Sequence, residues 1–101
     1  MQLIQLLLPL ADNDGAPFPP GLLRAIQAEL TEKFGGVTAY SRAPAKGVWQ
    51  TGEGKQRDDI VILEVMAAEL DRDWWRDFRK RLEKDLRQEA VIVRAQAMDL
   101  L

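Results

Sequence analysis

Neither cysteine nor histidine occurs anywhere in this chain of 101 residues. Without cysteine, a disulfide framework, an iron–sulfur cluster and a thiol nucleophile are all excluded. Without histidine, the chain lacks the commonest general base and the commonest metal ligand. Any proton transfer would fall to Asp, Glu, Lys or Tyr, and we expect no metal site and no cofactor.

An excess of positive charge is also absent, because 14 basic residues stand against 16 acidic ones and the net charge is −2. Binding to nucleic acid needs a clear basic excess or a basic stripe that neutralises phosphates. The basic residues of segment 76–87 alternate with acidic ones, which is typical of a solvated helix face. The sequence therefore predicts no nucleic-acid partner.

The chain has no apolar run of the roughly twenty residues that a membrane span requires. Its opening apolar segment, residues 3–10, is interrupted by Gln5 and has no Lys or Arg before it, unlike a secretory signal. We therefore expect a cytoplasmic protein with no membrane segment.

The patterns that are present predict one α+β domain over residues 1–101, with strands and helices in alternation. The first helix follows Pro19 and Pro20 and ends before Gly35, and the second begins at Asp71 or Asp73 and reaches about Glu89. Apolar spacing of three and four places Trp75 on the buried stripe of the second helix and Trp74 at its margin. Strands are expected at 3–8, 37–50, 60–66 and 91–98, with a hairpin loop at 51–54.

The order strand, helix, strand, strand, helix, strand predicts a ferredoxin-like βαββαβ sandwich. It has a four-stranded antiparallel sheet of order 4-1-3-2 and both helices on one face. Segments 3–8 and 60–66 are apolar on both faces, as expected of the two central strands. A different α+β arrangement of the same elements remains open.

Four short motifs resemble a small bacterial family of unknown function. They are Phe34-Gly35-Gly36-Val37-Thr38, Gly47-Val48-Trp49, Arg57-Asp58-Asp59 and Arg87-Gln88-Glu89. The resemblance covers most of the chain after the first helix. It implies a compact α+β fold and identifies no activity, cofactor or catalytic residue.

The face of the sheet that points away from the helices is expected to be largely apolar. If Ile4, Leu6, Leu8, Val61, Leu63 and Val65 face the helices, the opposite face presents Leu3, Leu7, Ile60, Ile62, Met66, Ile92 and Met98. A monomer rarely exposes so much contiguous apolar surface. We therefore predict a homodimer, with an interface made by Leu3, Gln5, Leu7, Ile60 and Ile62.

Any small-molecule ligand is expected near Tyr40, Trp49, Glu64 and Arg94. Tyr40 and Trp49 are large aromatic residues in a glycine-containing segment, and Glu64 and Arg94 lie on neighbouring strands of the outer face. Two structural alternatives stay open. The aromatic residues would cap the end of the sheet, and Glu64 and Arg94 would form an ion pair.

Two functions follow from these patterns. The favoured one is a non-enzymatic homodimeric domain with a binding or regulatory role, which associates through its sheet face. The alternative is a cofactor-free enzyme of the dimeric α+β barrel type, acting on a small apolar substrate with Glu64 buried in the site. The missing His and Cys favour the first, whether the protein is an enzyme stays undecided, and no catalytic residue is assigned.

Overall fold

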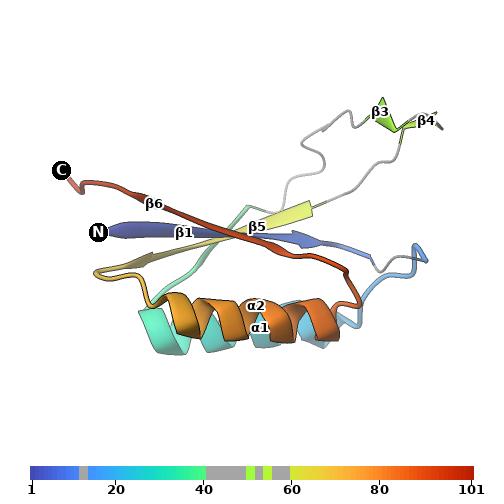
Figure 1. Cartoon of the computed structure of the whole chain (residues 1–101). Coiled ribbons are helices and arrows are strands. Elements are labelled where there is room, and N and C mark those ends of the chain that lie inside the picture. The colour runs from blue at the N-terminus through green and yellow to red at the C-terminus, as the bar shows by residue number, and fades with distance from the viewer. Residues whose placement is uncertain (12–13, 41–49, 52–53, 56–59) are drawn as a thin grey trace.

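The computed structural model describes residues 1–11, 14–40, 50–51, 54–55 and 60–101 (Figure 1). The strands are β1 (Gln2–Pro9), β2 (Thr38–Tyr40), β3 (Gln50–Thr51), β4 (Gly54–Lys55), β5 (Ile60–Ala67) and β6 (Ile92–Ala97). The helices are α1 (Pro20–Phe34) and α2 (Arg72–Asp85). Within the described residues, no helix is long and apolar enough to cross a membrane.

Four strands form one antiparallel sheet in the order β2-β5-β1-β6, and β3 and β4 pair separately. If only the strands of the main sheet are numbered, this order is 2-3-1-4, which is the predicted 4-1-3-2 in the opposite direction. The ferredoxin-like fold is thus confirmed, with β1 and β5 at the centre as their two apolar faces predicted.

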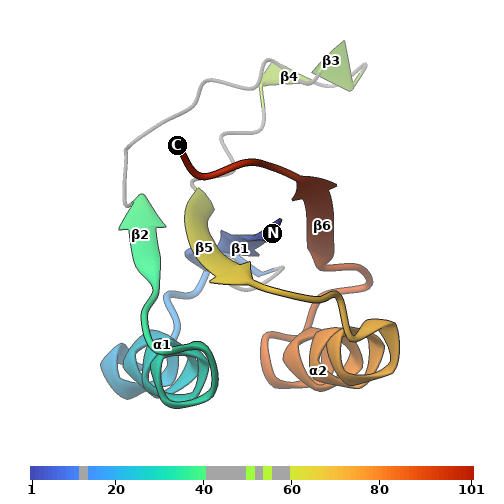
Figure 2. The same ribbon diagram turned by 90° about the vertical axis from the view of Figure 1, so that its left-hand side faces the viewer.

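Both helices lie against one face of this sheet and leave the other face without a helix (Figure 2). Helix α1 ends because Gly35 adopts a left-handed conformation (φ 82°), in which glycine has no steric penalty. Helix α2 begins where the side chain of Asp71 accepts a hydrogen bond from the backbone N–H of Trp74 at 3.1 Å. Both boundaries agree with the sequence.

The core lies between the helices and the sheet, and every buried residue that the structure describes there is apolar. Alternate residues of β1 and β5 supply its sheet side, and all six are at most 2% exposed: Ile4, Leu6, Leu8, Val61, Leu63 and Val65. From α2, Trp75 is 5% exposed, while Trp74 is only partly buried and stacks on Phe78. The predicted phases of both strands and of α2 are confirmed.

Two predicted boundaries differ from the structure. Helix α2 ends at Asp85 rather than near Glu89, because Arg87 has a positive φ of 51° and the N–H of Gln88 turns back to the carbonyl of Glu83 at 2.9 Å. The strand expected at 37–50 is described only as Thr38–Tyr40 and, in a separate pair, Gln50–Thr51. Val37 lies outside these strands, and residues 41–49, Gly47 and Trp49 among them, lie outside the described residues.

Candidate functional site

Polar side chains from all four strands of the main sheet occupy one row of its outer face. In the strand register, Gln5 on β1 lies opposite Glu64 on β5 and opposite Arg94 on β6, and Glu64 also lies opposite Thr38 on β2. Side chains alternate between the faces of a strand, and the neighbours of Gln5 and Glu64 are buried in the core. Gln5 and Glu64 therefore point away from the helices.

Three residues of this row, together with Tyr40 on β2, form a continuous chain of hydrogen bonds, which we call the polar chain. The Nε of Arg94 donates to Oε1 of Gln5 at 2.7 Å, and Nε2 of Gln5 donates to Oε1 of Glu64 at 2.5 Å. The hydroxyl of Tyr40 donates to the other carboxylate oxygen of Glu64 at 3.1 Å. Tyr40, Glu64, Gln5 and Arg94 thus connect all four strands in sequence across the sheet.

The amide of Gln5 occupies the place between the two charged groups. Its oxygen faces the guanidinium and its nitrogen faces the carboxylate, so each end of the amide meets a charge that it complements. Of the ion pairs among described residues, none joins Glu64 to Arg94. Within one chain the two charges are therefore bridged by Gln5, and a pair between Glu64 and Arg94 across a dimer interface stays a prediction.

Tyr40 is the titratable group that the polar chain changes most clearly. The hydrogen bond from its hydroxyl to Glu64, followed by the negative charge of Glu64 and a small desolvation, raises the pKa of Tyr40 above its usual value of 10.0. Its side chain is 48% exposed. Tyr40 is therefore a neutral hydrogen-bond donor at physiological pH, with a ring that solvent or a ligand can reach.

Apolar side chains border the polar chain on the same face. The adjacent row of the register is Ile92, Leu7, Ile62 and Tyr40, while Leu3 and Met66 pair on the opposite side. Met66 and Ile92 are 51% and 56% exposed, and Leu3, Leu7 and Ile62 are partly buried. The surface offers an apolar platform beside two opposite charges, which suits a ligand with both an apolar ring and charged groups.

Three of the four predicted ligand residues, Tyr40, Glu64 and Arg94, thus come together, while Trp49 lies outside the described residues. Leu3, Leu7, Ile60 and Ile62 also lie on the outer face as expected, but their role in a dimer stays a prediction.

The sequence interpretation missed one participant, because it assigned Gln5 to the dimer interface alone. The available signal was a single polar residue in an apolar strand, at the register position between Glu64 and Arg94. As for metals, the described residues contain no group of three or more acidic side chains that would hold an ion.

No family model and no curated protein matches the chain. The resemblance to a bacterial family of unknown function therefore stays a prediction. Among solved structures, the chain is similar to a phage SAM lyase in complex with S-methyl-5′-thioadenosine. The TM-score is 0.58 and the identity 18%, and the match covers 94% of this chain and 79% of the other. At this identity, the match shows a common fold.

This match corrects the function that the composition favoured. The sequence predicted a homodimeric binding or regulatory domain, whereas a solved structure with this fold is a phage SAM lyase. The chain shares its ferredoxin-like fold with a lyase, and its outer sheet face places Tyr40, Gln5, Glu64 and Arg94 in one connected group.

Proposed function

We propose that this protein is an enzyme that cleaves a carbon–sulfur bond of S-adenosylmethionine and releases S-methyl-5′-thioadenosine at the outer face of its sheet. The observation that supports this proposal most directly is the polar chain, which presents a carboxylate and a guanidinium beside an apolar platform. The fold that it shares with a SAM lyase over 94% of its length adds to this support.

The charges of the polar chain match those of S-adenosylmethionine. This molecule has a sulfonium and an ammonium group, which attract the carboxylate of Glu64, and a carboxylate, which the guanidinium of Arg94 is suited to bind through two hydrogen bonds. The adenine ring packs on the apolar row of Leu7, Ile62 and Ile92, where the ring of Tyr40 closes one end. Each part of the substrate thus finds a complementary group.

The reaction that fits this arrangement breaks the bond between sulfur and the amino-acid side chain. The electron pair of that bond stays on sulfur, which becomes the neutral thioether. The substrate's own carboxylate oxygen forms the new bond to the same carbon, and a lactone closes without gain or loss of a proton. Because a positive and a negative charge disappear together, an apolar surrounding favours this step.

Glu64 and Arg94 act by positioning the substrate in this scheme. Both oxygens of Glu64 already accept hydrogen bonds, from Gln5 and Tyr40. The carboxylate is therefore placed as a fixed charge, whereas the competing route, an elimination, needs a base that removes a carbon-bound proton. Elimination gives a vinyl product that is an isomer of the lactone, and proton NMR distinguishes the two.

The test is incubation of the purified protein with S-adenosylmethionine and measurement of S-methyl-5′-thioadenosine by chromatography and mass spectrometry. We expect turnover by the wild type and a loss of about ten- to a hundredfold in kcat/KM for Glu64→Gln. Glu32→Gln, an equal change on an exposed residue of α1, should leave turnover unchanged. The proposal is wrong if the wild type forms no more product than the protein-free solution and calorimetry detects no binding of S-methyl-5′-thioadenosine.

We also propose that a second copy of the chain covers part of the outer face. Leu3 and Ile60 are partly exposed in one chain and lie on either side of the row that the adenine ring occupies, and their burial against a symmetric copy supports a stable homodimer. Such a cover also removes water from the edge of the polar chain.

We propose a cytoplasmic location. Its support is that the apolar segment Gln2–Pro9 forms the central strand β1 and buries three residues in the core.

A further inference from the structure

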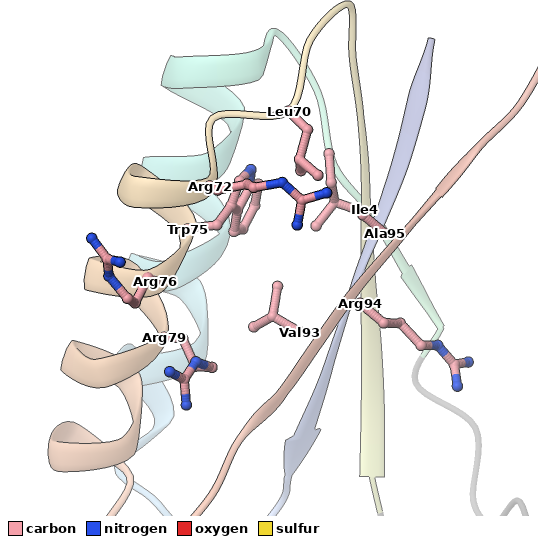
Figure 3. A pocket seen from close by; sticks show the side chains of 9 residues that line it. All are labelled: Ile4, Leu70, Arg72, Trp75, Arg76, Arg79, Val93, Arg94 and Ala95. Atoms are coloured by element: carbon pink, nitrogen blue, oxygen red, sulfur yellow. The ribbon is translucent and has the colours of Figure 1, made fainter.

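A pocket of about 280 Å³ lies between helix α2 and the edge strand β6, on the side of the sheet that faces the helices (Figure 3). Its apolar lining comes from Ile4, Leu70, Trp75 and Val93. Three arginines of α2 line it as well, namely Arg72, Arg76 and Arg79. Arg72 extends over this apolar floor and Arg79 lies beside it, whereas the side chain of Arg76 points away from the pocket (Figure 3).

This pocket and the polar chain share one residue, because Arg94 on β6 belongs to the lining of the pocket and also donates a hydrogen bond to Gln5 in the polar chain. Along that strand, Val93 and Ala95 point to the helix side, and the side chain of Arg94 points away from the pocket toward the other face (Figure 3). A molecule in the pocket would therefore lie on the opposite side of β6 from Glu64 and Tyr40.

The three arginines lie on one face of α2 because they are spaced by four and three residues. Arg76 pairs with Asp73 at 2.8 Å, and Arg79 pairs with Glu83 at 3.2 Å. No acidic residue is among the described residues that line the pocket, and within the described part of the chain Arg72 has no carboxylate partner. Arg72 nevertheless extends over the apolar lining toward Ile4 and Ala95 (Figure 3).

Packing alone does not account for Arg72. Among the described residues, Lys33 lies over the rings of Phe34 and Trp74, and Arg81 lies over the ring of Phe78. Arg72 makes no such contact with Trp75. An unpaired guanidinium above an apolar cavity attracts an anion, and its planar donors fit a carboxylate or a phosphate.

We propose that this pocket binds a small organic anion, with its carboxylate or phosphate group held by Arg72 and its apolar part on Trp75 and Val93. Arg79 is placed to bind the same anionic group as Arg72. Glu83, its present partner, also accepts a hydrogen bond from the N–H of Val91 at 2.9 Å, and it keeps that bond if Arg79 turns to the ligand. The volume lies just below the range of about 300–1,000 Å³ that is usual for small-molecule sites. This size suits one ring or a short acyl chain.

The test is an NMR titration of the isotope-labelled protein with four probes, phenyl phosphate, benzoate, inorganic phosphate and neutral benzyl alcohol. We expect phenyl phosphate or benzoate to shift the signals of Leu70, Trp75 and Val93 in a saturable way, and the tighter of the two identifies the anionic group. Inorganic phosphate lacks the apolar part and benzyl alcohol lacks the charge, so both should bind more weakly.

Two variants test the two halves of the pocket separately. Arg72→Gln should weaken binding of the tighter aryl anion about tenfold or more, since it removes a charged hydrogen bond. Ala95→Leu should also weaken it by narrowing the cavity, without a change of charge. Arg24→Gln, on the exposed surface of α1, serves as the matched control and should have no effect.

The proposal is overturned if neither aryl anion gives saturable shifts at millimolar concentration, or if Arg24→Gln weakens binding as much as Arg72→Gln does. It is also overturned if inorganic phosphate binds as tightly as phenyl phosphate, because the apolar floor would then have no role. No S-adenosylmethionine is present in this titration, so its outcome is independent of the proposed lyase activity.

Discussion

The two faces of the central strands β1 and β5 differ, although successive residues of each strand point alternately to one face and to the other. On the helix side, Ile4, Leu6 and Leu63 are 0% exposed and lie in a continuous apolar core. On the outer side, Gln5 and Glu64 are partly exposed and take part in the polar chain. One strand thus supplies the interior of the protein with every second residue and its candidate site with the others.

The difference follows from the cost of burying polar atoms. A polar group without a hydrogen-bond partner is costly in an apolar interior, so the helix side contains no buried polar or charged residue among those described. On the outer side, water and neighbouring strands supply partners, and described side chains leave no buried polar atom unpaired. The outer face therefore presents polar side chains that the core side of the same two strands lacks.

The largest effect that tests this comparison is on stability. Leu6 and Leu7 are adjacent on β1, but Leu6 is 0% exposed while Leu7 is partly exposed on the outer face. We expect Leu6→Ala to lower the free energy of unfolding by about 2–5 kcal/mol, and Leu7→Ala by less than half as much. Urea denaturation of both variants measures this, and equal losses would mean that the two faces do not differ as described.

The second effect concerns association of the outer face. Ile62→Glu places a charge among the apolar residues of that face, where each fully buried side chain would contribute about 1.5–3 kcal/mol. Two-fold symmetry makes each substitution act twice. We therefore expect gel filtration with light scattering to find a dimer for the wild type and a monomer for the variant.

Lys84→Glu, an exposed change on α2, is the control and should leave the dimer intact. A monomeric wild type at tens of micromolar contradicts the dimer. A dimer that tolerates Ile62→Glu shows instead that association uses another surface.

The smallest effect is on the titration of Tyr40, which is the only tyrosine of the chain and can be followed by absorbance. We expect its pKa to lie above 10.0 in the wild type and to fall toward that value in Glu64→Gln, because the hydrogen bond and the charge of Glu64 raise it. The neutral form is therefore favoured in the folded state. The hydrogen bond of neutral Tyr40 contributes its full stabilisation below the pKa that Tyr40 has in the unfolded state. This stabilisation is lost as the pH rises through the higher pKa of the folded state. An unchanged pKa in Glu64→Gln would contradict the polar chain.

Most of the fold was predictable because alternation and helical spacing are local properties. Period two in β1 and β5 identified their buried residues, and the turns at Gly35 and Asp71 set one end of each helix. The end of α2 was not predictable from spacing, because it depends on Arg87 adopting a conformation that non-glycine residues seldom take.

The candidate site was predictable only in part. The outer face and the closeness of Tyr40, Glu64 and Arg94 followed from the expected strand order. The role of Gln5 in the polar chain depends on the register of β1 against β5 and β6. This register is fixed by pairing across the sheet, and it places Gln5 between the charges of Glu64 and Arg94. The preference for a binding or regulatory domain relied on missing His and Cys, and missing residue types do not exclude chemistry by carboxylate, guanidinium and phenol groups.

The sequence by itself determined which residues are buried, since the free energy of removing apolar side chains from water depends on pattern and composition. Only the tertiary structure decided which polar residues meet, because Gln5, Glu64 and Arg94 are far apart in the chain and become neighbours through antiparallel pairing. The same holds for the arginine-lined pocket, since helical spacing puts its arginines on one face, but only the packing of α2 beside β6 gives that face an apolar floor.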